Sequence, residues 1–296
     1  SDWLAAINEL QRFRMDYPSH ELTPETSEKL VLAYQESGQG LKAAEELLSR
    51  SETLADPWPT RLRAAAIFHA EGDSASRNQL YKNWLAVAPT PDSAEEHVQQ
   101  QTMRQRLIES GDATGAIREQ LLAQERASQW HSEDTLQWAA DAALFFGALT
   151  AERFAGIALA HPLEQALARK QAAMQQSQEY LQEAESFAGD GVRSEVLYRR
   201  AELYRTLASD LMSSEVPAEL NEMEAMQYQM LLEEQAFPLE EEAMALHARN
   251  HERIPTEGFD EWIQRSLEAL ATMHPGRYDR QLRWMSWTTD TNQGGS

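Results

Sequence analysis

Apolar residues along this chain recur three or four positions apart, with polar residues between them. That spacing predicts amphipathic helices, each of which buries one side. Only 13 Gly and 11 Pro leave few turn signals for many short strands. We therefore expect an all-α fold. Helices are predicted over residues 2–16, 23–37, 40–53, 58–71, 74–87, 92–110, 113–128, 132–147, 150–159, 163–187, 196–211 and a few residues beyond, 219–236, 238–250 and 259–273.

The N-terminal helices follow a repeat. One copy consists of Leu30, Tyr34, Gly38, Ala43 and Leu47, and a second of Phe68, Gly72, Tyr81, Trp84 and Pro89. Gly38 and Gly72 are 34 residues apart. In each copy a Gly permits the tight turn between two helices, and Pro89 falls where a second helix must end. Looser copies run through Gly111 and Gly147.

This 34-residue spacing resembles the tetratricopeptide (TPR) repeat. The resemblance implies a right-handed α-solenoid, in which antiparallel helix pairs stack on one another. The copies are degenerate, since Arg77 and Gln120 stand where the family usually has other residue types. The alternative is a helical bundle without a true repeat. Both alternatives are all-α.

Three segments are expected along the chain. Residues 1–190 hold the degenerate repeats, and residues 191–287 hold further helices and a cap on the same solenoid. The Gly189-Asp190-Gly191 sequence is the clearest candidate for a linker between them. Residues 288–296 are polar and Gly-ended, so we expect a disordered tail.

The charge balance limits the possible partners. The chain contains 26 Lys and Arg residues and 48 Asp and Glu residues, which gives a formal net charge of −22. So acidic a surface disfavours nucleic acids and anionic membranes and favours a protein or peptide partner with basic segments. No apolar run approaches the ~20 residues that span a bilayer, so direct membrane insertion is not expected. The absence of Cys excludes disulfides and thiolate metal sites.

Much of the negative charge lies near the C-terminus. Residues 215–261 contain thirteen acids and two bases. This strip is either a solvated face or a docking face for a basic segment. The candidate docking residues are Glu233, Glu234, Glu240, Glu241 and Glu242. A basic and aromatic patch follows, which is expected to cap the array or to contact a partner. Its residues are Arg277, Tyr278, Arg280, Trp284 and Trp287.

The TPR resemblance also implies a binding groove, because the first helix of each pair in that family lines a concave surface that takes peptides. When the concave-face positions of that family are aligned with this sequence, they fall on the candidate groove residues Glu28, Gln35, Leu62, His69, Gln101, Gln105 and Glu109. Their mixture of carboxylate, amide and imidazole groups suits a peptide better than a hydrophobic small molecule.

Residues 213–217, 231–238 and 275–278 resemble the C-terminal part of large TPR-rich proteobacterial proteins that are associated with TonB/ExbB/ExbD-type systems. The resemblance implies a periplasmic location and envelope partners of that type. It also implies that the chain, which begins at Ser1, is a piece of a longer protein. A cytoplasmic location is the alternative.

Catalytic signals are weak. His247 and His251 would share a helix face, but a third metal ligand and the H-E-x-x-H order are missing, so we expect exposed histidines. Paired carboxylates and Trp residues leave open an all-helical carbohydrate-active enzyme. Phosphate-binding loops and G-x-S-x-G are absent. We therefore expect a non-catalytic interaction scaffold without cofactor or metal, with an intracellular peptide-sensing regulator as the second alternative.

Overall fold

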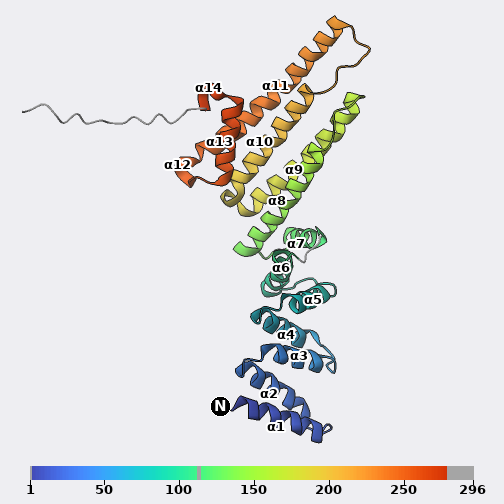
Figure 1. Ribbon diagram of the computed structural model, residues 1–296, viewed down its shortest axis with the longest axis vertical. Helices are drawn as coiled ribbons and strands as arrows, with labels where there is room; N and C mark the ends of the chain where they lie inside the picture. Colours follow the sequence, from blue (N-terminus) through green and yellow to red (C-terminus); the bar gives the residue numbers. More distant parts are fainter. Residues whose placement is uncertain (1, 112–114, 279–296) are drawn as a thin grey trace, which may run out of the picture. The chain divides into compact units, whose positions relative to one another are not determined.

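The computed structural model describes residues 2–111 and 115–278, and these form an all-α helical solenoid without strands (Figure 1). Consecutive helices pack against one another as pairs. The chain divides into two compact units, of which unit 1 ends at Trp138 and unit 2 begins at Ala139. The units therefore do not divide at 190/191. The expected tail, residues 288–296, lies outside the described residues.

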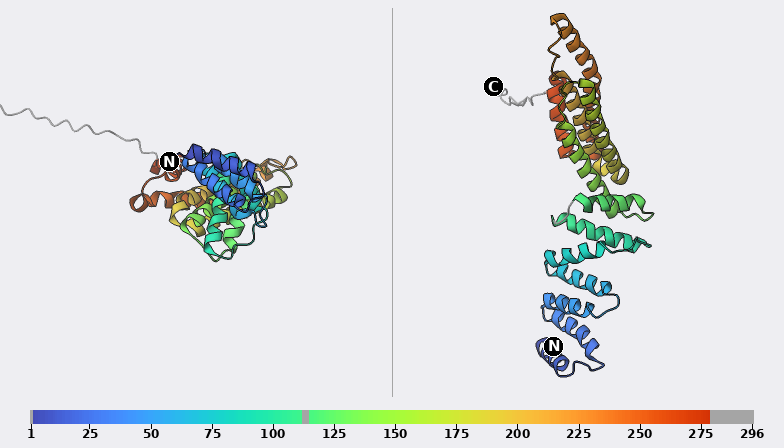
Figure 2. Two further views of the ribbon diagram at one scale, coloured as in Figure 1. Left: turned by 90° about the horizontal axis from the view of Figure 1, so that it is seen from below. Right: turned by 90° about the vertical axis from the view of Figure 1, so that its right-hand side faces the viewer.

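Unit 1 is built from short helices, each of which packs on the next one in sequence (Figures 1 and 2). They are α1 (Trp3–Asp16), α2 (Thr23–Glu36), α3 (Gly40–Ser51), α4 (Trp58–Ala70), α5 (Ser74–Leu85), α6 (Ala94–Glu109) and α7 (Gly115–Ala127). The predicted ranges match these bounds to within a few residues. Hydrophobic spacing is thus sufficient to locate the helices of this unit.

The turns of unit 1 depend on glycine. Gly38, Gly72 and Gly111 have φ values of 72°, 79° and 69°, in the left-handed region where a side chain is strained. After Gly38 and Gly72 the next helix begins within two residues. Asp73 caps α5 by accepting a hydrogen bond from the Ser76 backbone N–H at 3.0 Å. All three glycines are predicted repeat glycines, and their role as turn residues is confirmed.

Small residues let the helices of unit 1 approach closely. Ala43, Ala44, Ala64 and Ala65 are fully buried, beside large side chains such as Leu47. An Ala at a helix crossing leaves room for the larger side chains of the facing helix, and the buried apolar area stabilises the pair by ~25 cal/mol per Å². Ala43 of the first repeat copy is therefore a packing residue that lets its helix lie close to its neighbours.

Unit 2 is built mainly from longer helices. Apart from the part of α8 (Glu133–Ala155) that follows Trp138, they are α9 (Leu163–Ala188), α10 (Asp190–Met212), α11 (Glu222–Glu252), α12 (Ile254–Glu257), α13 (Glu261–Met273) and α14 (Pro275–Tyr278). α10 packs along both α9 and α11, and α13 packs on α10 and α11. Gly189, with φ of 54°, forms the corner from α9 to α10, so the Gly189–Gly191 sequence is a tight corner and not a linker.

Two predicted helix boundaries are wrong. Residues 132–159, which were expected to hold two helices, contain the single helix α8, and Gly147 lies inside it. A Cβ on Gly147 would meet Leu181 Cδ2 at 3.0 Å, and Ser177 Oγ donates to the Gly147 carbonyl at 2.8 Å. Gly147 thus permits α9 to approach α8 and makes no turn.

The second wrong boundary is at Pro238, which lies inside the 31-residue helix α11. Proline lacks a backbone N–H and removes one helical hydrogen bond, yet its φ suits a helix. Ala236 and Ala243 are buried on either side of it. We attribute the continuity of α11 to this packing, which holds both halves of the helix in line.

A buried lysine joins three helices of unit 2. Lys170 on α9 is fully buried, and its Nζ donates to the carbonyls of Phe154 at 2.8 Å and Ile157 at 2.9 Å. The same Nζ lies 2.7 Å from Asp210 Oδ2 on α10. The ammonium group therefore caps the C-terminal end of α8 and pairs with a carboxylate, which compensates for its removal from water.

Candidate functional site

A surface hollow crosses α4, α5 and α6 of unit 1. It consists of two adjoining parts of about 480 and 290 Å³, which share Leu62, Ala66 and Gln99. The remaining lining residues are Asp56, Trp58, Pro59, Arg63, Trp84, Tyr81, Thr102, Met103 and Arg106. These two adjoining parts together are the candidate binding groove.

Aromatic rings form one end of the groove. The Trp58 and Trp84 rings lie 5.1 Å apart, and the Arg61 guanidinium lies 5.1 Å from the Trp58 ring. At the other end, Arg106 Nη1 donates to the Tyr81 hydroxyl at 2.8 Å. Aromatic faces can bury apolar side chains, while amide and guanidinium groups can bind a peptide backbone. The chemistry of the groove suits a peptide.

Some of the predicted groove residues lie in or near this hollow. Leu62 lines it. His69 lies exposed at the end of α4, 3.0 Å from Arg77 Nη1, and the positive charge of Arg106, with burial and Arg77, lowers the pKa of His69. Gln35 is exposed but does not line the hollow.

Glu28 has a structural role. Its carboxylate accepts hydrogen bonds from Arg63 Nη1 at 2.9 Å and Nη2 at 3.1 Å, and it also pairs with Arg50. The three residues come from α2, α4 and α3, so the carboxylate joins successive helix pairs. Because both oxygens are engaged, Glu28 is a link between repeats and is not free to bind a ligand.

The prediction of which side of α6 lines the groove is wrong. Gln101 is fully buried and donates to the Leu121 carbonyl at 3.0 Å. Gln105 donates to Glu109 at 3.1 Å, and neither lines the hollow. The observed face carries Gln99, Thr102, Met103 and Arg106. The two faces differ by roughly a third of a turn, as a register error of one residue produces at ~100° per residue.

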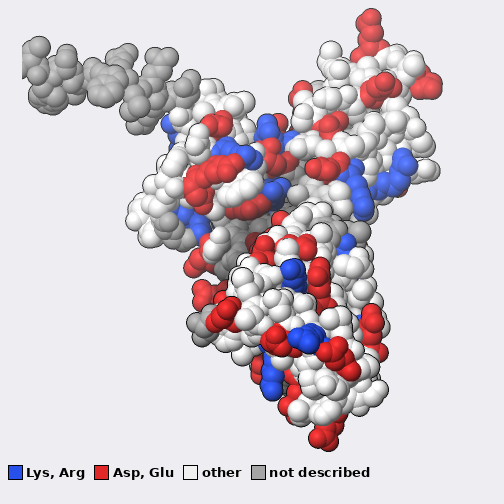
Figure 3. Space-filling model, turned by 60° about the horizontal axis from the view of Figure 1, so that its bottom comes forward, with Lys and Arg blue, Asp and Glu red and all other residues white. Residues whose placement is uncertain are grey.

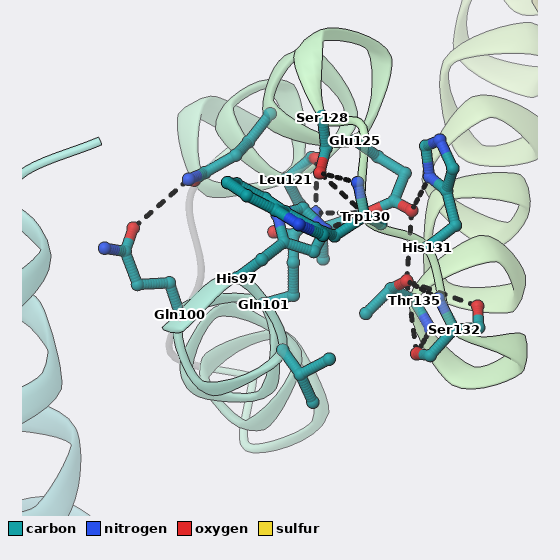
Figure 4. Close-up of polar contacts among 12 residues, drawn as sticks. His97, Gln100, Gln101, Leu121, Glu125, Ser128, Trp130, His131, Ser132 and Thr135 are labelled. Atoms are coloured by element: carbon teal, nitrogen blue, oxygen red, sulfur yellow. Dashed lines mark hydrogen bonds and ion pairs between the residues drawn. The ribbon is translucent and has the colours of Figure 1, made fainter. Parts of the chain in front are cut away.

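A buried carboxylate on α7 contacts residues of α6 and of the start of α8 (Figure 4). Glu125 is fully buried, and its two oxygens are 2.8 Å from His97 Nε2 and 2.9 Å from His131 Nδ1. Gln101 Nε2 donates to it at 2.9 Å and Thr135 Oγ1 at 3.0 Å. The carboxylate thus joins α6, α7 and the start of α8.

Burial by itself raises the pKa of Glu125, but hydrogen bonds from Gln101, His131, His97 and Thr135 outweigh it and hold the pKa below 4.5. A general acid needs the opposite shift. A hollow of about 280 Å³ beside His97 is lined by Trp130 and its neighbours. We assign the network a structural role. Sequence analysis missed it, since His97 and Glu125 are 28 residues apart and form no motif.

The predicted acidic face lies on α11. Glu233, Glu234, Glu240, Glu241 and Glu242 are all exposed. Figure 3 shows acidic side chains as red patches among white ones at the end of unit 2 where α11 begins. Residues 206–248 contain no Lys or Arg. The surface is accessible to a partner, as the docking hypothesis requires.

The predicted C-terminal patch is described only in part. Arg277 lies 5.3 Å from the Tyr278 ring, and Tyr278 contacts the His251 ring edge-on at 6.1 Å. α14, which contains both residues, packs on α13. Arg280, Trp284 and Trp287 lie outside the described residues.

The expectation of two exposed histidines is wrong for His247. Its side chain is fully buried, with Nε2 3.3 Å from Glu202 and its ring 5.7 Å from Tyr198, whereas His251 is exposed. Packing of α11 on α10 buries this position, which the sequence pattern does not reveal.

Among residues 2–111 and 115–278, no group of three or more potential ligands could hold a metal ion. Over the same ranges, no helix combines the length and the hydropathy needed to cross a bilayer. No protein-family model matches the chain, and no curated protein matches it either.

Proposed function

We propose that this protein is a non-catalytic scaffold that binds a peptide segment of another protein in the groove over α4, α5 and α6. The observation that carries the proposal is the pair of adjoining hollows in unit 1, one lined by Trp58 and Trp84 and the other by Arg106. Aromatic and Arg side chains are the residue types that contribute most to protein interfaces. A solenoid of helix pairs holds such a surface rigidly.

The shape of the groove suits an extended ligand. Its two parts adjoin along the helix pairs, so several side chains of one peptide can contact it at once. Its lining combines apolar side chains with the hydrogen-bonding groups of Gln99 and Thr102 and the charges of Asp56, Arg63 and Arg106. Apolar pockets with a few polar groups give both affinity and orientation.

Filling the groove tests the proposal. Ala66 is exposed and lines both parts, so Ala66→Trp is expected to block them without disturbing the core. Peptides selected on the wild-type protein from a random 12-residue library should bind Ala66→Trp at least ~10-fold more weakly. Ala70→Trp is the matched control, because Ala70 is exposed on the same helix but lines neither part.

Two results of this experiment would contradict the proposal. One is a failure to select any peptide on the wild-type protein. The other is that the selected peptides bind Ala66→Trp as tightly as Ala70→Trp, because they would then contact another surface.

We also propose that the scaffold belongs to a bacterial envelope complex with TonB/ExbB/ExbD-type partners. The support is the resemblance of residues 213–217, 231–238 and 275–278 to envelope-associated TPR proteins. Fractionation of native cells is expected to recover the protein with the periplasm. Recovery with the cytosol would contradict the envelope location while leaving the groove proposal intact.

A further inference from the structure

The first half of α11 exposes several large apolar side chains, and most of them share one side of the helix, the Met stripe. It consists of Met223, Met226, Met230 and Phe237, which are 72, 65, 63 and 59% exposed. Their spacing of three, four and seven residues puts them within ~60° of one another around the helix. Leu231, which is 52% exposed, lies off this side. Isolated exposed apolar residues are ordinary, but three Met residues one turn apart, with Phe237 beyond Glu233 and Glu234 on the same side, mark an interaction surface.

The Met stripe lies on the side of α11 that faces away from the core of unit 2. The buried residues of the same stretch, Leu232, Ala236 and Ala243, lie on the opposite side. The first turns of α11 also extend past the end of α10 (Figures 1 and 2). The residues of the Met stripe are therefore not the ones that pack α11 against the rest of unit 2.

Carboxylates surround the stripe on its own helix. They are Glu222, Glu224, Glu233, Glu234, Glu240, Glu241 and Glu242. No Lys or Arg occurs from 206 to 248 to offset them. A second copy of this helix would bring like charges together, and an anionic lipid surface would be repelled in the same way. Charge complementarity thus selects a positively charged occupant.

We propose that the Met stripe binds a basic amphipathic helix of another protein. The apolar side of that helix would cover Met223, Met226 and Met230, and its Lys and Arg residues would pair with the flanking carboxylates. Methionine suits this role, because its unbranched, polarisable side chain adapts to differently shaped partners. The carboxylates accelerate encounter, and the apolar contacts set affinity and register.

This site goes beyond the groove of unit 1 and does not depend on it. The groove uses residues of α4, α5 and α6, whereas the stripe lies on α11. The Ala66→Trp substitution that tests the groove leaves the stripe unchanged. Failure of either proposal is therefore distinguishable from failure of the other.

The test measures binding of a synthetic 18-residue Leu/Lys amphipathic helix to the full chain by fluorescence anisotropy. A peptide of identical composition but scrambled order, which has no apolar face, is the first control. The combined substitution Met223→Ser, Met226→Ser and Met230→Ser is expected to weaken binding at least ~10-fold. Met15→Ser is the matched variant, because Met15 is 74% exposed on α1.

Charge is tested separately. Glu233→Gln with Glu234→Gln is expected to weaken binding by ~3-fold or more, and added salt should reduce the remaining affinity. Thermal unfolding should show that these exposed substitutions leave the fold intact. If the triple variant unfolds, Met230→Ser alone repeats the test, with an expected loss of ~3-fold or more.

Three results would overturn the proposal. In the first, the scrambled peptide binds as tightly as the amphipathic one. In the second, the Met variants retain wild-type affinity, which would reduce the effect to general attraction between opposite charges. In the third, sedimentation shows that the chain self-associates and that the Met substitutions abolish it, which would make a second copy the occupant.

Discussion

Units 1 and 2 are both built from helices that pack on their neighbours in sequence, but the helices differ in length. The helices of unit 1 that precede α8 are 12 to 16 residues long. Three of their turns contain a glycine with positive φ, and Gly189 and Gly258 have the same backbone conformation in unit 2. In unit 2, α9, α10 and α11 are 26, 23 and 31 residues long, and α11 continues through Pro238.

The difference separates local from tertiary control of structure. A positive-φ glycine ends a helix through its own backbone, whatever surrounds it. Gly147 and Pro238 would also interrupt helices on local grounds, yet α8 and α11 continue through them. Their continuity follows from contacts with α9 and α10. Local rules therefore predict unit 1 well and unit 2 less well.

The largest expected effect tests the buried contacts of unit 2. Lys170→Ala leaves the carbonyls of Phe154 and Ile157 and the carboxylate of Asp210 without their shared partner. We expect a loss of about 3 kcal/mol in the free energy of unfolding. Urea unfolding, with hydrogen exchange of α8 and α9 to localise the change, provides the measurement.

Exposed Lys29 on α2 provides the control for this substitution, and Lys29→Ala should change stability by less than about 0.5 kcal/mol. Lys170→Met should recover part of the loss, because it keeps the apolar stem. Equal losses for Lys170→Ala and Lys29→Ala would show that the buried ammonium does not determine how α8, α9 and α10 pack.

The next effect concerns Glu125, the point where unit 1 also depends on tertiary contacts. Glu125→Gln removes the charge that His97, His131 and Gln101 contact, so we expect a loss of about 2 kcal/mol at neutral pH. Glu119→Gln, at an exposed position of the same helix, is the control and should have little effect.

The effect of Glu125→Gln should depend on pH. Because folding lowers the pKa of Glu125 below 4.5, the ionised carboxylate stabilises the fold above that pH. The contribution is lost as the pH falls from 4.5 through the pKa of the folded protein. Wild type and Glu125→Gln should therefore converge in stability below pH 4.5, as thermal unfolding at several pH values can show. A constant difference would contradict this role.

The smallest effect tests the local turns. Gly72→Ala puts a Cβ on a residue with φ of 79° and should cost about 1 kcal/mol. Gly115→Ala is the matched substitution, because Gly115 lies in α7 with nothing within 4 Å of a new Cβ. It should be neutral or stabilising by up to about 1 kcal/mol. Equal thermal stability of the two variants would remove the distinction between turn and helix glycines.

The candidate sites show the same division. Leu62 was predicted in the groove and lines it, because helix spacing alone nearly determines its direction. Gln101 was predicted on the same surface but is buried, because a register error of one residue rotates a side chain by ~100°. His247 was expected to be exposed, and its burial depends on Tyr198 and Glu202 of another helix.

Sequence alone determined the all-α fold, the helices of unit 1 and the glycine turns, since each follows from interactions within a few residues. It also revealed the acidic strip, because charge is a property of composition. Tertiary structure decided which face of α6 lines the groove, which carboxylate joins His97 to His131, and which side of α11 remains exposed. These features depend on contacts between side chains of different helices, which the spacing of residues within one helix does not reveal.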